Sequence, residues 1–267
     1  MAKKKTTKKE ESMLPVKYDY GADSGAGFEN QTQDDYQIPF LNQLQALSPE
    51  ISGSKDEKLV GAETGMFVNS VSKKLYGEVI LVPCMTKHSY VEWKPRDQGG
   101  GFVAEHAIDS PIVAEAKAAA AGDITKLKTQ SGNDLIDTFS IFAVIIDEPF
   151  AEQPDDMVVI SFAKTKAKRY REIMTRIRTC KDAKNAPLFA HQLRMTATDE
   201  VNAAKQPYKN VKLTPAVEND VLKSMLPPGN AILEAARALS DSVKTGAAKA
   251  NFDSASEAPA GTGDEHF

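Results

Sequence analysis

Cysteine is scarce in this chain of 267 residues, which contains only Cys84 and Cys180. Two cysteines so far apart make no disulfide framework, and this usage is typical of a reducing compartment. They form no CxxC pair, and the four histidines form no HExxH motif. Because zinc sites need such closely spaced ligands, we expect no metal site.

Phosphate-binding glycine motifs are missing as well. The chain has neither a GxxxxGK[ST] loop nor a GxGxxG turn, which argues against nucleotide-dependent enzymes and predicts no cofactor. It has no apolar run long enough to span a membrane, and no apolar stretch follows its lysine-rich start. We therefore expect no secretory signal, no membrane association and a cytoplasmic location.

The two ends of the chain have the composition of disordered segments. Five lysines fall within the first nine residues, and Gly, Ser, Asp and Gln dominate up to residue 35. Ala, Ser, Gly, Asp and Glu dominate from residue 246 onward. Such segments bury too little apolar surface to fold. The sequence thus predicts a basic arm (1–35), one folded domain (36–245) and an acidic tail (246–267).

A stretch from Gly77 to Phe102 combines an apolar run with interleaved aromatic and basic side chains. The run at 79–82 predicts a buried strand, and Pro83 predicts a sheet edge, a bulge or a strand end. Further along lie Lys87, His88, Tyr90, Trp93, Lys94 and Arg96, followed by three glycines at 99–101 that let the backbone bend. A groove for single-stranded nucleic acid needs such a combination, but an ordinary hairpin can have it too.

Strand alternation separates the aromatic residues of this stretch. Tyr90 and Lys94 fall on one side, and Val91 and Trp93 fall on the other. We expect the Tyr90 side to be exposed and available for base stacking. Trp93 fits a core position at least as well, and Phe102 is open to both interpretations.

Elsewhere the periodicity predicts more strands than helices. We expect strands at 61–71, 134–147, 157–163, 187–198 and 208–213, and helices at 40–47, 111–121, 165–179, 215–225 and 230–243. The strands follow one another without regular intervening helices. This indicates a mainly β, α+β fold, an OB-like five-stranded barrel with an inserted basic helix and C-terminal helices.

Positive charge is concentrated around the helix expected at 165–179. From residue 164 to residue 184 there are nine Lys and Arg against two acids, a local charge of +7 in a chain whose net charge is −4. A basic cluster of this density attracts phosphates. The alternative is a solvated helix face paired with acidic neighbours, although the helix itself contains only one acid, Glu172.

The chain ends in Gly-Asp-Glu-His-Phe. A mobile acidic segment that carries a terminal aromatic residue can dock into a basic-rimmed pocket on a partner. Asp264, Glu265 and Phe267 are therefore candidate partner-binding residues, and a purely solubilising tail is the alternative.

Several segments together resemble bacteriophage single-stranded-DNA-binding proteins. The segments are MVVISFAKTKAKRYREIMTRI, PLFAHQLRMTA, QPYKNVKL, IPFLNQLQALSPE, GMFVNS and YVEWKPRDQGGGF. The resemblance implies an OB-fold that binds single strands and an acidic, aromatic-tipped tail that recruits replication enzymes. Phe267 matches that tip, whereas the acidic residues before it are sparse and His266 interrupts them.

We therefore expect a non-catalytic protein that coats single-stranded DNA with little sequence preference during phage replication or recombination. Its partners would be single-stranded DNA, a phage polymerase, helicase or recombinase, and other copies of itself. Two alternatives stay open: a virion or scaffold protein, and a metal-dependent nucleic-acid enzyme using Glu92, Glu105 and His106. The expected DNA-binding residues are Lys87, Tyr90, Trp93, Lys94, Arg96, Phe102, Lys164, Lys166, Lys168, Arg169 and Arg171.

Overall fold

The computed structural model describes residues 26–27, 37–121, 123, 126–202, 205–246, 250 and 252, and it leaves the side chain of Arg96 undescribed. The chain divides into two units, Met1–Asp35 and Tyr36–Phe267. Apart from residues 26–27, everything below concerns the second unit. The lysines of the basic arm and the tail residues Asp264, Glu265 and Phe267 lie outside the described residues.

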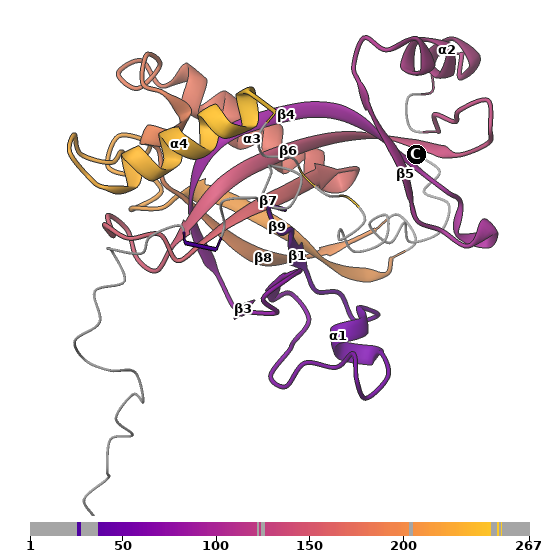
Figure 1. Ribbon diagram of the computed structural model, residues 1–267, viewed down its shortest axis with the longest axis horizontal. Helices are drawn as coiled ribbons and strands as arrows, with labels where there is room; N and C mark the ends of the chain where they lie inside the picture. Colours follow the sequence, from indigo (N-terminus) through magenta and orange to yellow (C-terminus); the bar gives the residue numbers. More distant parts are fainter. Residues whose placement is uncertain are drawn as a thin grey trace, which may run out of the picture. The chain divides into compact units, whose positions relative to one another are not determined.

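Two antiparallel sheets and four α-helices make up the fold, which confirms the predicted α+β class (Figure 1). The small sheet contains β1 (Leu41–Gln43), β2 (Phe67–Asn69) and β3 (Leu75–Tyr76). The large sheet runs in the order β7 (Asp156–Ala163), β6 (Asp134–Ile146), β4 (Val79–Trp93), β8 (Leu193–Val201) and β9 (Pro207–Pro215), and β5 (Phe102–Ala107) pairs with β4. The helices are α1 (Pro49–Ser52), α2 (Pro111–Ala119), α3 (Thr165–Thr179) and α4 (Ile232–Lys244), with 3₁₀ turns at Arg96–Gln98 and Leu188–Ala190.

The expected five-stranded barrel is not closed by strand pairing, because β7 and β9 form the two ends of the described ladder. Strand β1 and the residue before it contact both ends. Phe40 forms a parallel bridge with Val159 of β7. On the other side, the side-chain amide of Gln43 donates to the Asn210 carbonyl of β9 at 3.0 Å. The β7 edge is thus contacted by main chain, and the β9 edge is contacted by the side chain of Gln43.

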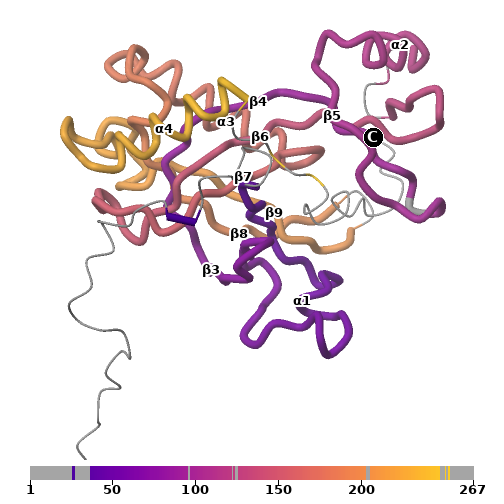
Figure 2. The backbone as a smooth tube through the Cα atoms, in the orientation of Figure 1, coloured from indigo at the N-terminus to yellow at the C-terminus, as the bar shows by residue number. Residues whose placement is uncertain are grey.

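Strands β4 and β6 pair along almost their whole length and extend beyond the other strands toward β5 and α2 (Figures 1 and 2). The first three residues of β4, 79–81, also pair with β8, and the last part also pairs with β5. The register shifts between Pro83 and Met85. Pro83 has no N–H for the ladder, and the predicted bulge is confirmed.

Each face of this ladder is covered by a different set of residues. On the inner face, Leu81, Ile141 and Ile160 pack with Ile173 and Ile177 of α3. On the outer face, α4 covers the buried residues of β4 and β6, and the contacting residues are Val82, Val144, Ile232, Ala236 and Leu239. Fully burying one such side chain stabilises the fold by about 1.5–3 kcal/mol.

Two of the predicted helices are absent from the structure. Phe40 and Leu41 pack into separate clusters on opposite sides of an extended strand, and Leu47 is exposed. Pairing with β2 therefore overrides the helical spacing. Residues 216–225 form turns, because Glu218 and Asn219 adopt positive φ angles of 48° and 55°, which no helix accommodates.

Helix α3 is fastened to the β8–β9 hairpin by Glu200. The carboxylate accepts hydrogen bonds from Tyr208 at 2.7 Å and Asn210 at 2.8 Å, and it pairs with Arg169 of α3. Burial alone opposes ionisation of Glu200, but these hydrogen bonds outweigh it and lower its pKa to about 2. The carboxylate therefore holds the helix against the hairpin in its charged form.

We predict that Glu200→Gln destabilises the protein by about 2 kcal/mol at pH 7, because a folded-state pKa below the unfolded value stabilises the charged state. This contribution is present above the unfolded pKa of about 4.5 and is lost as the pH falls toward 2. Urea unfolding at pH 7 and pH 3 measures it. Glu218→Gln, at a carboxylate 68% exposed, is the control and should change stability little. An equal loss at both pH values would contradict the prediction.

Candidate nucleic-acid interface

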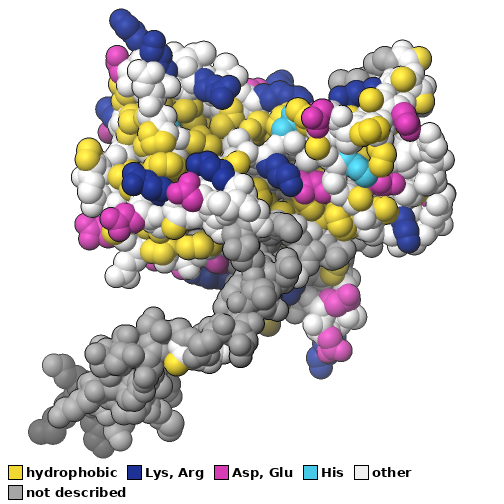
Figure 3. Space-filling view, turned by 45° about the horizontal axis from the view of Figure 1, so that its top comes forward, with side chains coloured by type: hydrophobic (Ala, Val, Ile, Leu, Met, Phe, Trp, Pro, Cys, Tyr) yellow, Lys and Arg dark blue, Asp and Glu magenta, His cyan; other side chains and the backbone are white. Residues whose placement is uncertain are grey.

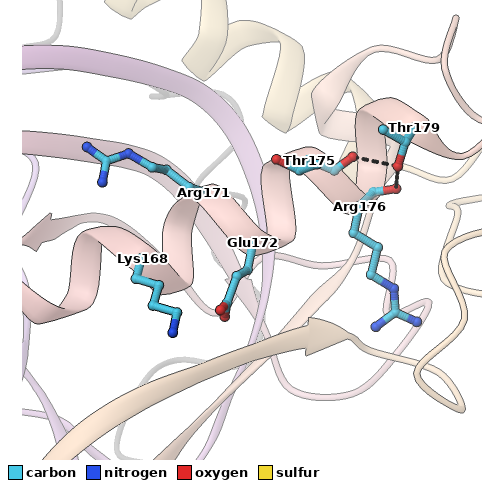
Figure 4. Close-up of a pocket in the computed structure, with 6 residues that line it drawn as sticks. All are labelled: Lys168, Arg171, Glu172, Thr175, Arg176 and Thr179. Carbon is cyan, nitrogen blue, oxygen red and sulfur yellow. Dashed lines mark hydrogen bonds between the residues drawn. The ribbon is translucent and has the colours of Figure 1, made fainter.

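Helix α3 presents the largest concentration of cations on the described surface. Its apolar residues Ile173 and Ile177 are buried, Met174 packs partly against the same core, and Thr175 and Arg176 are exposed, as the helical spacing predicts. An open depression follows the exposed face. Figure 4 shows Arg171 pointing away from its neighbours Lys168 and Glu172. The six residues that line the depression are Lys168, Arg171, Glu172, Thr175, Arg176 and Thr179.

Acidic residues from other elements neutralise part of this charge. Arg169 pairs with Glu172 and Glu200, and Arg171 donates to Asp137 Oδ2 at 3.1 Å. The alternative of a salt-bridged helix face thus applies to these two arginines. Five exposed cations of the cluster have no ion pair with any residue that the structure describes: Lys168, Arg176, Arg178, Lys181 and Lys184. Among them, Arg176 donates instead to the side-chain oxygen of Asn219 at 2.6 Å.

Beside α3, three rings form a continuous stack. The ring centres of His88 on β4 and Phe139 on β6 lie 4.2 Å apart, and those of Phe139 and Tyr170 on α3 lie 4.7 Å apart, with interplanar angles of 19° and 20°. The Arg171 guanidinium lies 4.8 Å from the centre of the Phe139 ring. We call His88, Phe139 and Tyr170 the ring stack. It forms where the inner face of β4 and β6 meets the helix.

A carboxylate lies at the exposed edge of the ring stack. Asp137 Oδ1 is 2.6 Å from His88 Nε2, while Arg171 donates to Oδ2. The side chains of His88 and Asp137 are 39% and 30% exposed. Figure 3 shows Lys and Arg side chains lying among hydrophobic and acidic ones over this region of the molecule. The surface therefore combines stacking planes, positive charge and one acceptor.

The expectation that Tyr90 is exposed is wrong. Alternation places it on the opposite side from Val91 and Trp93 as predicted, but this is the inner face. There α2 covers it and leaves Tyr90 only 6% exposed, packed with Val113 and Ala116. Lys117 of the same helix lies over its ring, with Nζ 4.7 Å from the centroid. The helix itself was predicted from the sequence, but nothing in its periodicity indicates which strand it covers.

The other cations of the Gly77–Phe102 stretch lie apart from α3. Lys87 points to the outer face and pairs with Glu105 at 2.6 Å. Lys94 is exposed at the hairpin turn, where its N–H donates to the Gly101 carbonyl. All three glycines of that turn have positive φ, which only glycine adopts readily.

Trp93 and Phe102 are covered by a residue from the end of the chain. Trp93 is 5% exposed, so the core interpretation is confirmed. The Phe252 ring stacks on Phe102 at 5.4 Å and lies 5.2 Å from Phe40. We call Phe40, Trp93, Phe102 and Phe252 the outer aromatic cluster. Phe252 covers one face of the half-buried Phe102 ring, and Trp93 is almost fully buried within the cluster.

Lys166 and Lys164 differ from the cations of the exposed helix face. Lys166 is half-buried and lines a small cavity with Leu41, Gln43 and Phe67, and desolvation there lowers its pKa to about 8. Lys164 precedes the helix with a φ of 51°, an uncommon conformation for a residue with a side chain. We therefore remove Lys166 from the set of surface contacts.

In the structure, Glu92 and His106, two residues of the enzymatic alternative, form hydrogen bonds within the fold. Glu92 is buried and accepts hydrogen bonds from Asn133 at 2.7 Å and Thr129 at 3.1 Å, and its Oε2 lies 2.7 Å from His106. Burial opposes its ionisation, but these bonds lower its pKa. Among the described residues, no three His, Cys, Asp or Glu side chains are placed to hold a metal ion.

Sequence reasoning missed the central residues of this surface. Asp137 and Phe139 lie two positions apart on β6, so alternation alone puts them on one face. Their proximity to His88 depends on the β4–β6 register, in which His88 lies opposite Phe139. A single sequence carries no signal for that register.

A family model for Pam3 phage gp34-like proteins matches residues 7–249. The chain belongs to this family. The match covers most of the chain and confirms the expected association with bacteriophages. No curated protein and no solved structure matches the chain. None of the described helices of this family member is long and apolar enough to cross a membrane.

Replacing Phe252 by alanine should open the outer aromatic cluster. We predict that Phe252→Ala shifts the emission of Trp93, the only tryptophan, to longer wavelength, and destabilises the protein by about 3 kcal/mol through the lost packing. Fluorescence spectra in native buffer measure the shift. Phe150→Ala, at a ring that is 39% exposed, is the matched control and should leave the emission unchanged. Unchanged emission in Phe252→Ala would contradict the prediction.

The position of Lys166 has a different consequence. Its folded-state pKa of about 8 lies below the unfolded value of 10.5, so the unfolded chain binds more protons between these two pH values. We predict that Lys166→Met stabilises the protein at pH 7 by up to about 3 kcal/mol, and that the gain shrinks as the pH rises from 8 to 10.5. Urea unfolding across this range measures it. A loss of stability at pH 7 would show that the ammonium is well solvated.

Proposed function

We propose that this protein binds single-stranded DNA without catalysing a reaction, during phage replication or recombination. The observation that carries the proposal is the ring stack beside the basic face of α3. Aromatic rings next to mobile cations are the two components of a sequence-tolerant single-strand site. Here they come from β4, β6 and α3, and the fold places them on one surface.

In this proposal the phosphates follow α3. Lys168 and Arg178 supply charge that no described acid neutralises, and Arg171 supplies a guanidinium that is 57% exposed. Binding releases counterions from the strand, so these cations provide affinity that depends on salt. Lys181 and Lys184 extend the same charge beyond the end of the helix.

The bases stack on the exposed planes of His88 and Arg171. Phe139 and Tyr170 lie behind them and hold these planes in place, because stacked rings and a cation over a ring restrain one another. Such stacking is worth about 1–3 kcal/mol per base. Trp93 and Phe102 join the site only when Phe252 leaves the outer aromatic cluster.

The proposed partners beyond DNA follow from the tail. Asp264, Glu265 and Phe267 would dock on a phage polymerase, helicase or recombinase, with the terminal ring in a basic-rimmed pocket. Copies of the protein would bind side by side along one strand. Membership of a phage family supports a role in phage DNA metabolism over one in host metabolism.

We predict that a fluorescent oligothymidine binds with log affinity falling linearly with log salt. Replacing Lys168 and Arg171 together by alanine removes two cations, which should weaken binding about tenfold and reduce the slope by about 1.4. Fluorescence anisotropy over a salt series measures both quantities. The lost slope separates phosphate contact from a general change in folding.

Lys55→Ala combined with Lys58→Ala is the matched control, because it removes the same charge from an exposed loop that follows α1. Its slope should equal that of the unchanged protein. If the two double variants weaken binding equally, only net charge matters and the site is elsewhere. Absence of binding at low salt would overturn the proposal.

A further inference from the structure

The carboxylate of Asp137 is an unfavourable group to place in a site for a polyanion. It repels phosphates and neutralises part of the charge of Arg171. It is nevertheless held in place from two sides, by His88 and by Arg171, and its side chain is still 30% exposed. A fixed and accessible acceptor of this kind needs a donor on the ligand to offset its cost.

The lone-pair sites of Asp137 that accept no hydrogen bond indicate which donor would fit. A carboxylate offers about four lone-pair sites on its two oxygens, and one site on each oxygen is engaged here. Each oxygen therefore accepts one further hydrogen bond. The ligand that completes the pair presents two parallel N–H donors, which a carboxylate binds in bidentate fashion.

Only one DNA base has such an edge. Guanine presents N1–H and the N2 amino group side by side on its Watson–Crick edge. Thymine presents one N–H between two carbonyl oxygens, and adenine and cytosine each present an amino group beside a ring nitrogen acceptor. These acceptors would face the carboxylate and repel it. In a single strand the Watson–Crick edge is free to be read.

We infer that Asp137 gives this surface a preference for guanine among single-stranded DNA bases. The inference rests on the proposed function and adds base selectivity to it. The base stacks on the exposed plane of His88 or Arg171, and its edge reaches the carboxylate between them. The phosphate contacts of α3 stay independent of sequence, so the preference is superimposed on general binding.

The test compares oligonucleotides of about 16 nucleotides, a length within the range of one single-strand site. One is all thymidine, one carries isolated guanines spaced by thymines, and one carries deoxyinosine at the same positions. Inosine keeps N1–H and lacks the N2 amino group. We expect the guanine oligonucleotide to bind about tenfold more tightly than oligothymidine, with inosine in between. This comparison uses the unchanged protein, so it does not depend on how a variant folds.

Asp137→Asn should reduce the preference to within about twofold, because an amide presents one acceptor and one donor to the base. Binding of oligothymidine should be equal or tighter, since a repulsive charge is lost. Asp134→Asn is the matched control: it removes the same charge from the same strand, at a carboxylate 46% exposed that pairs with Lys128. It should keep the preference.

Equal binding of all three oligonucleotides by the unchanged protein would overturn the inference and leave the proposed function intact. A preference that survives in Asp137→Asn would also overturn it, since another group would then read the base. If the protein binds none of the oligonucleotides, the proposed function itself fails.

Discussion

The pairing of β4 with β6 is the constraint on which the rest of the structure depends. The ladder joins Ile80 to Ile146 at one end and Trp93 to Asp134 at the other, with one bulge after Pro83. Its first half lies between β7 and β8 in the large sheet, and its second half carries β5, which leads into α2. Because side chains alternate, this one register decides which residues meet α3 and which meet α4. A slip of one residue in either strand would move its side chains to the opposite face, such as Lys87 to the inner face or Phe139 to the outer face.

The dependence on the β4–β6 register explains which helices and strands were predictable from the sequence. Local signals sufficed for α2, α3, β6, β7 and the β8–β9 hairpin, whose periodicity and turn residues are strong. They failed at residues 40–47, where a helical spacing of apolar residues coincides with a strand that bridges two sheet edges. There the side chains pack on both sides of the chain, and only the tertiary partners decide between a helix and a strand.

The positive charge of the candidate surface was predictable from the sequence, but the residues that contact those cations were not. The basic cluster at 164–184 needs only counting, and its exposure on α3 follows from helical spacing. The acids that neutralise Arg169 and Arg171 come from β8 and β6, and the ring that Arg171 covers also comes from β6. Such contacts join residues about 30 positions apart. They are properties of the sheet register, which a single sequence does not encode in any local pattern.

The two faces of the β4–β6 ladder therefore have different roles in the proposed function. The inner face carries the ring stack, of which His88 is accessible, as is the neighbouring Arg171. The outer face carries Trp93, which is buried, and Phe102, which is half-buried and has one face covered by Phe252. A strand that binds first to the inner face has no need to compete with Phe252, because the ladder separates the two surfaces. In the proposed function, the rings of the inner and outer faces are therefore two separate surfaces on opposite sides of one ladder.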